Sequence, residues 1–178
     1  MSIEVIVAVV WGVFWVGWFL AAITATPGAR PRRARVPGLL FVIAFVVLRS
    51  SGATGGAIHS PPVRALGLLL LAAGLGVAIW ARVYLGRNWG MPMTEKERPE
   101  LVTSGPYRFV RHPIYSGLLL AMLGSALAAT LWWLVILAGL GSYFIYSARV
   151  EERLMTTAFP DAYPAYRATS KMLIPFVF

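Results

Sequence analysis

Two short segments hold residues whose types and spacing suit ligand chemistry. The first is SGPYRFVRHPIYSG at residues 104–117, where arginines, tyrosines and a histidine stand directly before a long apolar run. The second is SARVEERL at residues 147–154, which places the adjacent carboxylates of Glu151 and Glu152 at the end of the same run. Only 13% of the residues are charged, so their gathering in these two segments marks both as candidate sites.

The first segment predicts the start of a helix. The fixed φ and missing N–H of Pro113 suit a first helical turn. His112 would then occupy the cap position, beside free backbone N–H groups and the positive end of the helix dipole, which favour a carboxylate or phosphate. Tyr107 and Tyr115 offer flat apolar faces with a hydroxyl at the rim. Together they suit a small ligand that is partly aromatic and partly anionic, whereas Arg108 alone is typical of an interfacial anchor.

The second segment presents two carboxylates that need partners. Acidic side chains at membrane depth are costly unless paired, so Glu151 and Glu152 are candidates for function. Arg149 precedes Glu152 by three residues, and this helical spacing offers Glu152 an ion pair. Glu151 has no basic residue one helical turn away on either side. We therefore expect Glu151 to be the carboxylate available to a cationic ligand.

The overall composition indicates a membrane protein. Hydrophobic residues make up 58% of the 178-residue chain, and the mean hydropathy of +0.71 exceeds that of soluble domains. The absence of cysteine excludes disulfides, thiolate metal sites and cysteine nucleophiles. With two histidines, a metal centre is not expected. The basic residues fall in short blocks between apolar runs, which indicates membrane topology and not a nucleic-acid surface.

Apolar runs predict one all-α integral membrane domain over residues 1–178, with about five transmembrane helices. The run at 114–148 would form a helix of about 52 Å, which is too long for one crossing. A helical hairpin near Ala129 and Thr130 is therefore expected to provide the last two spans. Three spans are expected within residues 1–81, from the apolar runs at 5–23, 37–48 and 65–81. The last two spans come from the run at 114–148. The first two spans carry no recognisable motif.

The distribution of basic residues predicts the orientation. Five spans alternate the loops between the two sides, and fourteen of the sixteen lysines and arginines then share one side, leaving only Arg49 and Arg64 on the other. The positive-inside rule therefore predicts an outside N-terminus and a cytoplasmic site. The fourteen are Arg30, Arg32, Arg33, Arg35, Arg82, Arg87, Lys96, Arg98, Arg108, Arg111, Arg149, Arg153, Arg167 and Lys171.

The motifs resemble those of a known family. ELVTSGPYRFVRHPIYSG, followed by the Glu-Glu pair, then Y..Y and LIP, resembles the isoprenylcysteine carboxyl methyltransferase family and its bacterial relatives, which also resemble phospholipid N-methyltransferases. The similarity covers residues 84–178, and Arg-His-Pro-x-Tyr with the downstream Glu-Glu pair is a specific signal. It implies an integral membrane enzyme, placed in a bacterial inner membrane, whose methyltransferase-like half at 82–178 holds S-adenosylmethionine on the cytoplasmic side.

The resemblance also implies roles for individual residues. The family carries an arginine about one helical turn before the glutamate that contacts the cofactor, but this chain has Ser147 there and its arginine at 149. Arg149 is therefore the candidate for the substrate-side role, and Glu152 or His112 is the candidate base that an amine acceptor would need. The family's cofactor contacts fall on Leu101, Val102, Tyr107, His112, Pro113, Tyr115 and Glu151.

The reaction that these features favour is methyl transfer to a lipid-like acceptor that enters from the bilayer. An isoprenylcysteine-type carboxylate is the first candidate, because it is ionised at neutral pH and needs no general base. A phospholipid amine is the alternative. Sterol reductases that use NADPH look similar in this half but have asparagine where this chain has Pro113, and a non-enzymatic membrane protein is a further alternative. No metal and no nucleic acid is expected, and the sequence sets no oligomeric state.

Overall fold

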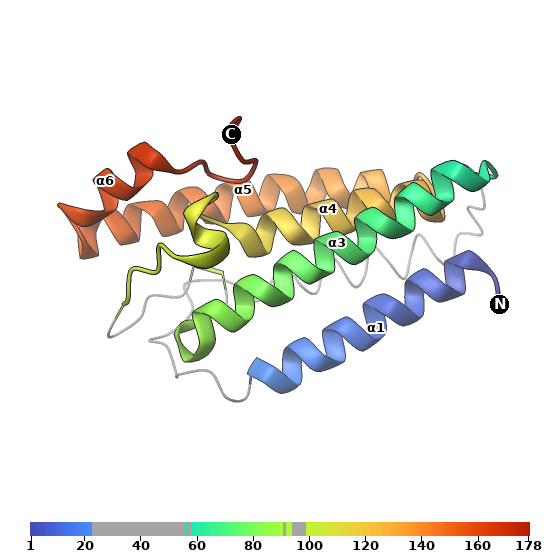
Figure 1. Cartoon of the computed structure of the whole chain (residues 1–178), viewed down its shortest axis with the longest axis horizontal. Coiled ribbons are helices and arrows are strands. Elements are labelled where there is room, and N and C mark those ends of the chain that lie inside the picture. The colour runs from blue at the N-terminus through green and yellow to red at the C-terminus, as the bar shows by residue number, and fades with distance from the viewer. Residues whose placement is uncertain (23–55, 57, 91, 94–98) are drawn as a thin grey trace.

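The computed structural model describes residues 1–22, 56, 58–90, 92–93 and 99–178 of the chain (Figure 1). Regular structure in these residues is helical, apart from isolated bridge residues such as the pair Val110 and Lys171. The helices are α1 (Ile3–Ala22), α3 (Pro61–Leu85), α4 (Pro113–Ala128), α5 (Trp133–Ala158) and α6 (Ala162–Thr169), with short 3₁₀ helices η1 (Gly86–Asn88) and η2 (Gly105–Arg108). The predicted all-α fold is confirmed.

Helices α1, α3 and α5 are long and apolar enough to cross a membrane. Their outward faces carry large apolar side chains that water would not solvate well, such as Val13 of α1, Val83 of α3 and Val135 of α5. A bilayer offers these faces an apolar solvent. The chain is therefore an all-α membrane protein, as expected. The predicted span at 37–48 lies outside the described residues.

Helix α4 forms the first arm of the predicted hairpin. It ends at Ala128 and α5 begins at Trp133, so the expected turn near Ala129 and Thr130 is confirmed. His112 occupies the N-cap position and Pro113 the first turn, also as expected. The 16 residues of α4 extend only about 24 Å, less than the roughly 30 Å of a hydrocarbon core. The predicted fourth span, α4, is therefore shorter than a hydrocarbon core is thick, and it lies beside the longer α5.

Glycines bring α3 and α4 into backbone contact. A Cβ on Gly74 would lie 2.4 Å from the nitrogen of Ala121, and a Cβ on Gly117 would lie 2.5 Å from the oxygen of Gly74. Gly67 and Gly124 make equally close approaches farther along the two helices. Small residues at this spacing let membrane helices pack at short range. This contact fixes the start of α4 relative to the end of α3.

Aromatic residues attach α1 to the other helices. Trp11 stacks on Trp133 of α5 with ring centroids 5.5 Å apart, and its indole N–H donates to Ser125 Oγ of α4 at 3.0 Å. At the other end of α1, Arg82 donates to the carbonyl of Ala21 at 2.9 Å. The same guanidinium lies 3.6 Å from the ring centroid of Trp89, in a cation–π contact.

The two chemistry-bearing segments meet at one end of the molecule. Figure 1 shows α1, α3, α4 and α5 running along the long axis, with the N-terminus at one end. At the opposite end lie the start of α4, the end of α5, η2 and α6. Residues separated by some forty positions in the sequence, such as Arg111 and Glu152, are thereby brought together.

Candidate functional site

A cavity of about 590 Å³ lies at this end of the molecule, within the size range of small-molecule sites. Aromatic and apolar side chains form most of its wall, and Glu151 supplies a carboxylate. Six of the seven residues predicted to contact a cofactor line it: Leu101, Val102, Tyr107, His112, Tyr115 and Glu151. The seventh, Pro113, is fully buried at the start of α4 and does not line the cavity.

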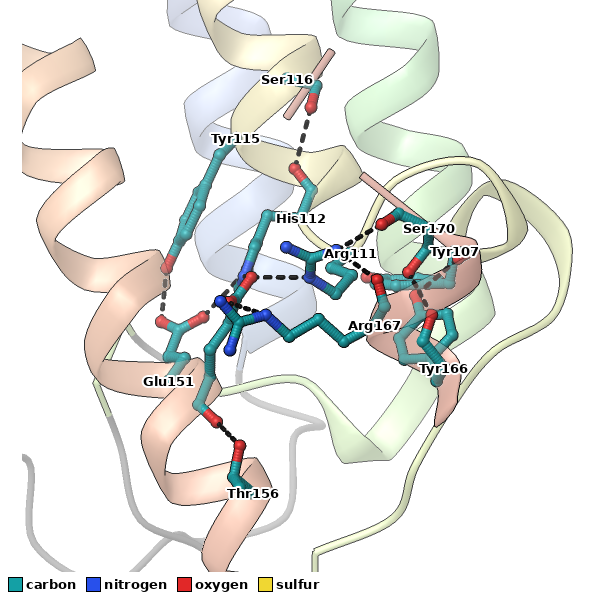
Figure 2. Close-up of polar contacts among 11 residues, drawn as sticks. Tyr107, Arg111, His112, Tyr115, Ser116, Glu151, Thr156, Tyr166, Arg167 and Ser170 are labelled. Atoms are coloured by element: carbon teal, nitrogen blue, oxygen red, sulfur yellow. Dashed lines mark hydrogen bonds and ion pairs between the residues drawn. The ribbon is translucent and has the colours of Figure 1, made fainter. Parts of the chain in front are cut away.

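Glu151 is held at the cavity wall by contacts from two other segments, the start of α4 and the residue Met93. Its Oε1 accepts a hydrogen bond from the Tyr115 hydroxyl at 2.6 Å and from the Met93 backbone N–H at 3.0 Å. Its Oε2 lies 3.4 Å from Nδ1 of His112, and 27% of the side chain is exposed. Figure 2 shows Tyr115 and His112 both pointing toward this carboxylate. Glu151 therefore has no basic partner within α5, but His112 from the start of α4 lies beside it.

Glu152 is buried and paired, but not with the predicted residue. Its side chain is 6% exposed, and Oε1 lies 2.7 Å from Nε of Arg111. Oε2 lies 3.6 Å from Nε of Arg167 in α6. Among the described residues Arg149 makes no ion pair with Glu152, and its side chain is exposed. The predicted Arg149–Glu152 pair is therefore wrong, because guanidinium groups from other segments reach the carboxylate.

His112 lies between the two glutamates. Its Nε2 is 3.5 Å from Oε1 of Glu152, and its ring stacks on Tyr115 at 5.5 Å between centroids. Burial lowers the pKa of His112, but the carboxylates on either side raise it by more, so that the net shift is upward. The ring therefore tends to hold a proton. The carboxylates of Glu151 and Glu152 therefore lie beside the start of α4. The expected open site for an anionic ligand is not present at this helix start.

The C-terminal tail closes one wall of the cavity. The backbone N–H of Arg111 donates to Lys171 O at 2.8 Å, and that of His112 donates to Met172 O at 3.1 Å. The Tyr166 hydroxyl donates to Tyr107 O at 2.5 Å. Burial raises the pKa of Tyr166 to about 12, so this hydroxyl stays a donor at neutral pH. Tyr166 lines the cavity together with Tyr163 of the same helix.

Part of the cavity wall comes from residues that the sequence analysis did not select. Trp15, Trp18 and Phe19 of α1 line the cavity, as does Trp89. A signal was available in the sequence, since Trp11, Trp15, Trp18 and Phe19 recur at helical spacing on α1. Such a stripe is also what a lipid-facing or core-packed helix carries. Periodicity alone could not assign it to a ligand.

Comparison with known proteins gives three similarities. Residues 63–162, more than half of the chain, match the phospholipid methyltransferase family. The chain is 38% identical over 98 residues to the cobalt-zinc-cadmium resistance protein CzcN of Cupriavidus metallidurans, which covers 53% of this chain and 44% of that protein. It is 31% identical over 117 residues to the protein-S-isoprenylcysteine O-methyltransferase of Schizosaccharomyces pombe, which covers 64% and 49%. The chain spans about half the length of these curated relatives.

Proposed function

We propose that this chain, which belongs to the phospholipid methyltransferase family, transfers a methyl group from S-adenosylmethionine to a lipid-like acceptor in the membrane. The observation that carries the proposal is the cavity in which a partly exposed carboxylate, Glu151, meets aromatic walls. The named activity of the fission yeast relative, protein-S-isoprenylcysteine O-methylation, supports the same reaction class.

The cavity residues fit this cofactor chemically. When bound, S-adenosylmethionine supplies a methyl group activated by a sulfonium. The Glu151 carboxylate would hold the positively charged part of the cofactor, and Tyr107 and Trp89 offer ring faces for its aromatic and cationic parts. Leu101 and Val102 would form the apolar side of the site. Pro113 would contribute by starting the helix that carries Tyr115.

The protein's own task in such a transfer is to align the acceptor and exclude water. Tyr115, His112 and Met93 fix the orientation of Glu151 through three contacts. The tail and α1 cover the cavity from two further sides with Tyr163, Tyr166 and the α1 aromatics. Glu152 and Arg111 would then act as positioning residues, because Arg111 pairs with Glu152 and Glu152 lies beside the His112 ring that contacts Glu151.

The surroundings of the two candidate bases favour a carboxylate acceptor. Glu152 is engaged by Arg111 and Arg167, and both ring nitrogens of His112 face the carboxylates of Glu151 and Glu152, so neither group is free to take a proton from an amine. An acceptor that is already ionised, such as an isoprenylcysteine-type carboxylate, needs no base. A phospholipid amine is the second candidate. Arg149 does not line the cavity, and its substrate-side role stays a prediction.

The proposal is tested by incubating the purified protein with methyl-labelled S-adenosylmethionine and a native lipid extract. We expect label in the organic phase and its release as methanol on mild base treatment, as a methyl ester requires. Base-stable label would indicate an amine acceptor. No transfer, together with thermal stabilisation by NADPH and not by S-adenosylhomocysteine, would contradict the proposal and favour a reductase. Glu151→Gln serves as the low-activity control.

We further propose that the protein lies in a bacterial inner membrane with its site on the cytoplasmic face. The basic residues support this orientation, because fourteen of sixteen fall on the side of the two motif segments. The N-terminus lies at the opposite end of the helices from α6 and the start of α4 (Figure 1), whose residues line the cavity, as this topology requires.

A further inference from the structure

A second, open groove lies beside the last turns of α5. None of the residues predicted to contact the cofactor lines it. We call it the basic groove, and its volume is about 670 Å³. Three arginines from two helices converge on it: Arg149 and Arg153 from α5, and Arg167 from α6. Its remaining lining residues are Glu152, Thr156, Thr157 and Met172. Thr157 is the one residue in this lining that also lines the cavity.

The basic groove carries unmatched positive charge. Its one acidic lining residue, Glu152, is buried and already paired with Arg111 at 2.7 Å. Arg167 lies 3.6 Å from the same carboxylate, yet 60% of its side chain is exposed. Arg149 and Arg153 are exposed and make no ion pair within the described part of the chain. The guanidinium groups of Arg149 and Arg153, together with the largely exposed one of Arg167, are therefore available to an external anion, and guanidinium matches phosphate in geometry.

The position of the basic groove indicates what kind of anion it meets. It lies beside the last turns of α5, a helix long enough to cross a membrane, and side chains just beyond a membrane span meet the lipid headgroups. Met172 in its lining leads into a tail whose apolar side chains are exposed: 54% for Ile174, 86% for Phe176 and 74% for Val177. Basic pockets beside transmembrane helices bind anionic headgroups, and exposed apolar side chains next to them favour the acyl region over water.

We propose that the basic groove binds the phosphate of an anionic phospholipid headgroup, and that this lipid anchors the end of α5 and the tail to the membrane surface. Arg149, Arg153 and Arg167 contact the phosphate, while the apolar tail residues lie against the acyl chains. This bound lipid is separate from the acceptor in the cavity. It gives Arg149, which does not line the cavity, a function independent of catalysis.

The test compares melting temperatures of the full-length protein in phosphatidylcholine nanodiscs with and without phosphatidylglycerol. A ligand that binds the folded state raises the melting temperature. We expect phosphatidylglycerol to raise it for the wild type and for Arg108→Gln, which removes an exposed charge outside the basic groove. For Arg153→Gln the rise should fall by at least half, and Arg153→Lys should restore most of it because it keeps the charge.

Two results would overturn the proposal. Equal rises for Arg153→Gln and Arg108→Gln would mean that the lipid acts on net charge and not through the basic groove. An equal rise with inorganic phosphate in phosphatidylcholine nanodiscs would mean that the groove takes a free anion and not a lipid. Binding of S-adenosylhomocysteine by Arg153→Gln, measured alongside, confirms that the variant is folded.

Discussion

At the scale of single residues, the two adjacent glutamates have different surroundings. Glu151 is 27% exposed and lines the cavity, whereas Glu152 is 6% exposed and paired with Arg111. The sequence distinguished them by an expected Arg149–Glu152 pair, which the structure does not contain. It could not identify Arg111 as the partner of Glu152, because that contact joins segments far apart in the chain.

Replacing the two glutamates by glutamine is predicted to affect different properties, cofactor binding for Glu151 and stability for Glu152. Glu151→Gln should weaken S-adenosylmethionine binding at least about tenfold in calorimetry, a loss of about 1.4 kcal/mol, because the neutral amide no longer balances the ligand's positive charge. Glu152→Gln should mainly reduce stability, by about 3 kcal/mol, the scale for breaking a buried ion pair. If Glu152→Gln weakens binding more while stability holds, the two roles are exchanged.

Arg149→Ala is the control for this comparison. Because Arg149 is exposed and does not pair with Glu152, its removal should leave the melting temperature in detergent unchanged. A loss as large as that of Glu152→Gln would restore the rejected Arg149–Glu152 pair. Loss of turnover with intact cofactor binding would instead support the substrate-side role that the resemblance implied for Arg149.

The raised pKa of His112 predicts a pH-dependent contribution to stability. Protonated His112 lies between two carboxylates in the folded protein, so its stabilising effect is full below the unfolded pKa of about 6.5. The effect is lost as the pH rises through the higher folded-state pKa. The difference in melting temperature between the wild type and His112→Gln should therefore shrink from pH 6 toward alkaline pH. His59→Gln, an exposed control, should show no such trend, and a constant difference for His112→Gln would refute the prediction.

At the scale of elements, the sequence predicted helices better than their contacts. Pro113 and the long run at 114–148 correctly indicated a helix start and a hairpin, because these signals are local. The short reach of α4 follows from the same signals, since they set its start at Pro113 and its end before Ala129. The partner of α4, in contrast, was not predicted. Its glycines meet those of α3 across more than forty residues, a match that only the folded backbone reveals.

The close contact between α3 and α4 predicts different effects for two glycines of the same helix. Gly74→Ala should destabilise the protein by about 1–3 kcal/mol, because the new Cβ would lie 2.4 Å from the backbone of Ala121. Gly76→Ala should leave stability unchanged or slightly raised, since nothing lies within 4 Å of its added Cβ. Thermal unfolding in detergent measures both, and equal effects would contradict this packing of α3 on α4.

At the scale of the whole molecule, the site is assembled from both ends of the chain. Trp15, Trp18 and Phe19 of α1 and Tyr163 and Tyr166 of α6 line one cavity. The central residues could be identified from the sequence because their motif is contiguous, whereas the first spans carry no recognisable motif. The residues of the cavity wall come together through long-range packing. Their spacing in the sequence therefore could not identify them. The cavity therefore takes in residues from outside the methyltransferase-like half.

The topology is open to a direct test because the chain contains no cysteine. Ser2 and Ser104 are exposed and directly precede α1 and η2. The N-terminus and η2 lie at opposite ends of the helices (Figure 1). In intact cells a membrane-impermeant thiol reagent should label Ser2→Cys but not Ser104→Cys, and both should react after lysis. The reverse pattern would place the cavity outside the cytoplasm and contradict the positive-inside argument.

The central claim is that the cavity binds S-adenosylmethionine, and calorimetric titration of neighbouring variants tests it most directly. Val102 lines the cavity, whereas the adjacent Thr103 is exposed and does not. A tryptophan at residue 102 would fill the space, so Val102→Trp should weaken cofactor binding at least about a hundredfold, or about 2.7 kcal/mol, while Thr103→Trp binds as the wild type does. No binding by folded wild type, or equal binding by both variants, would contradict the account.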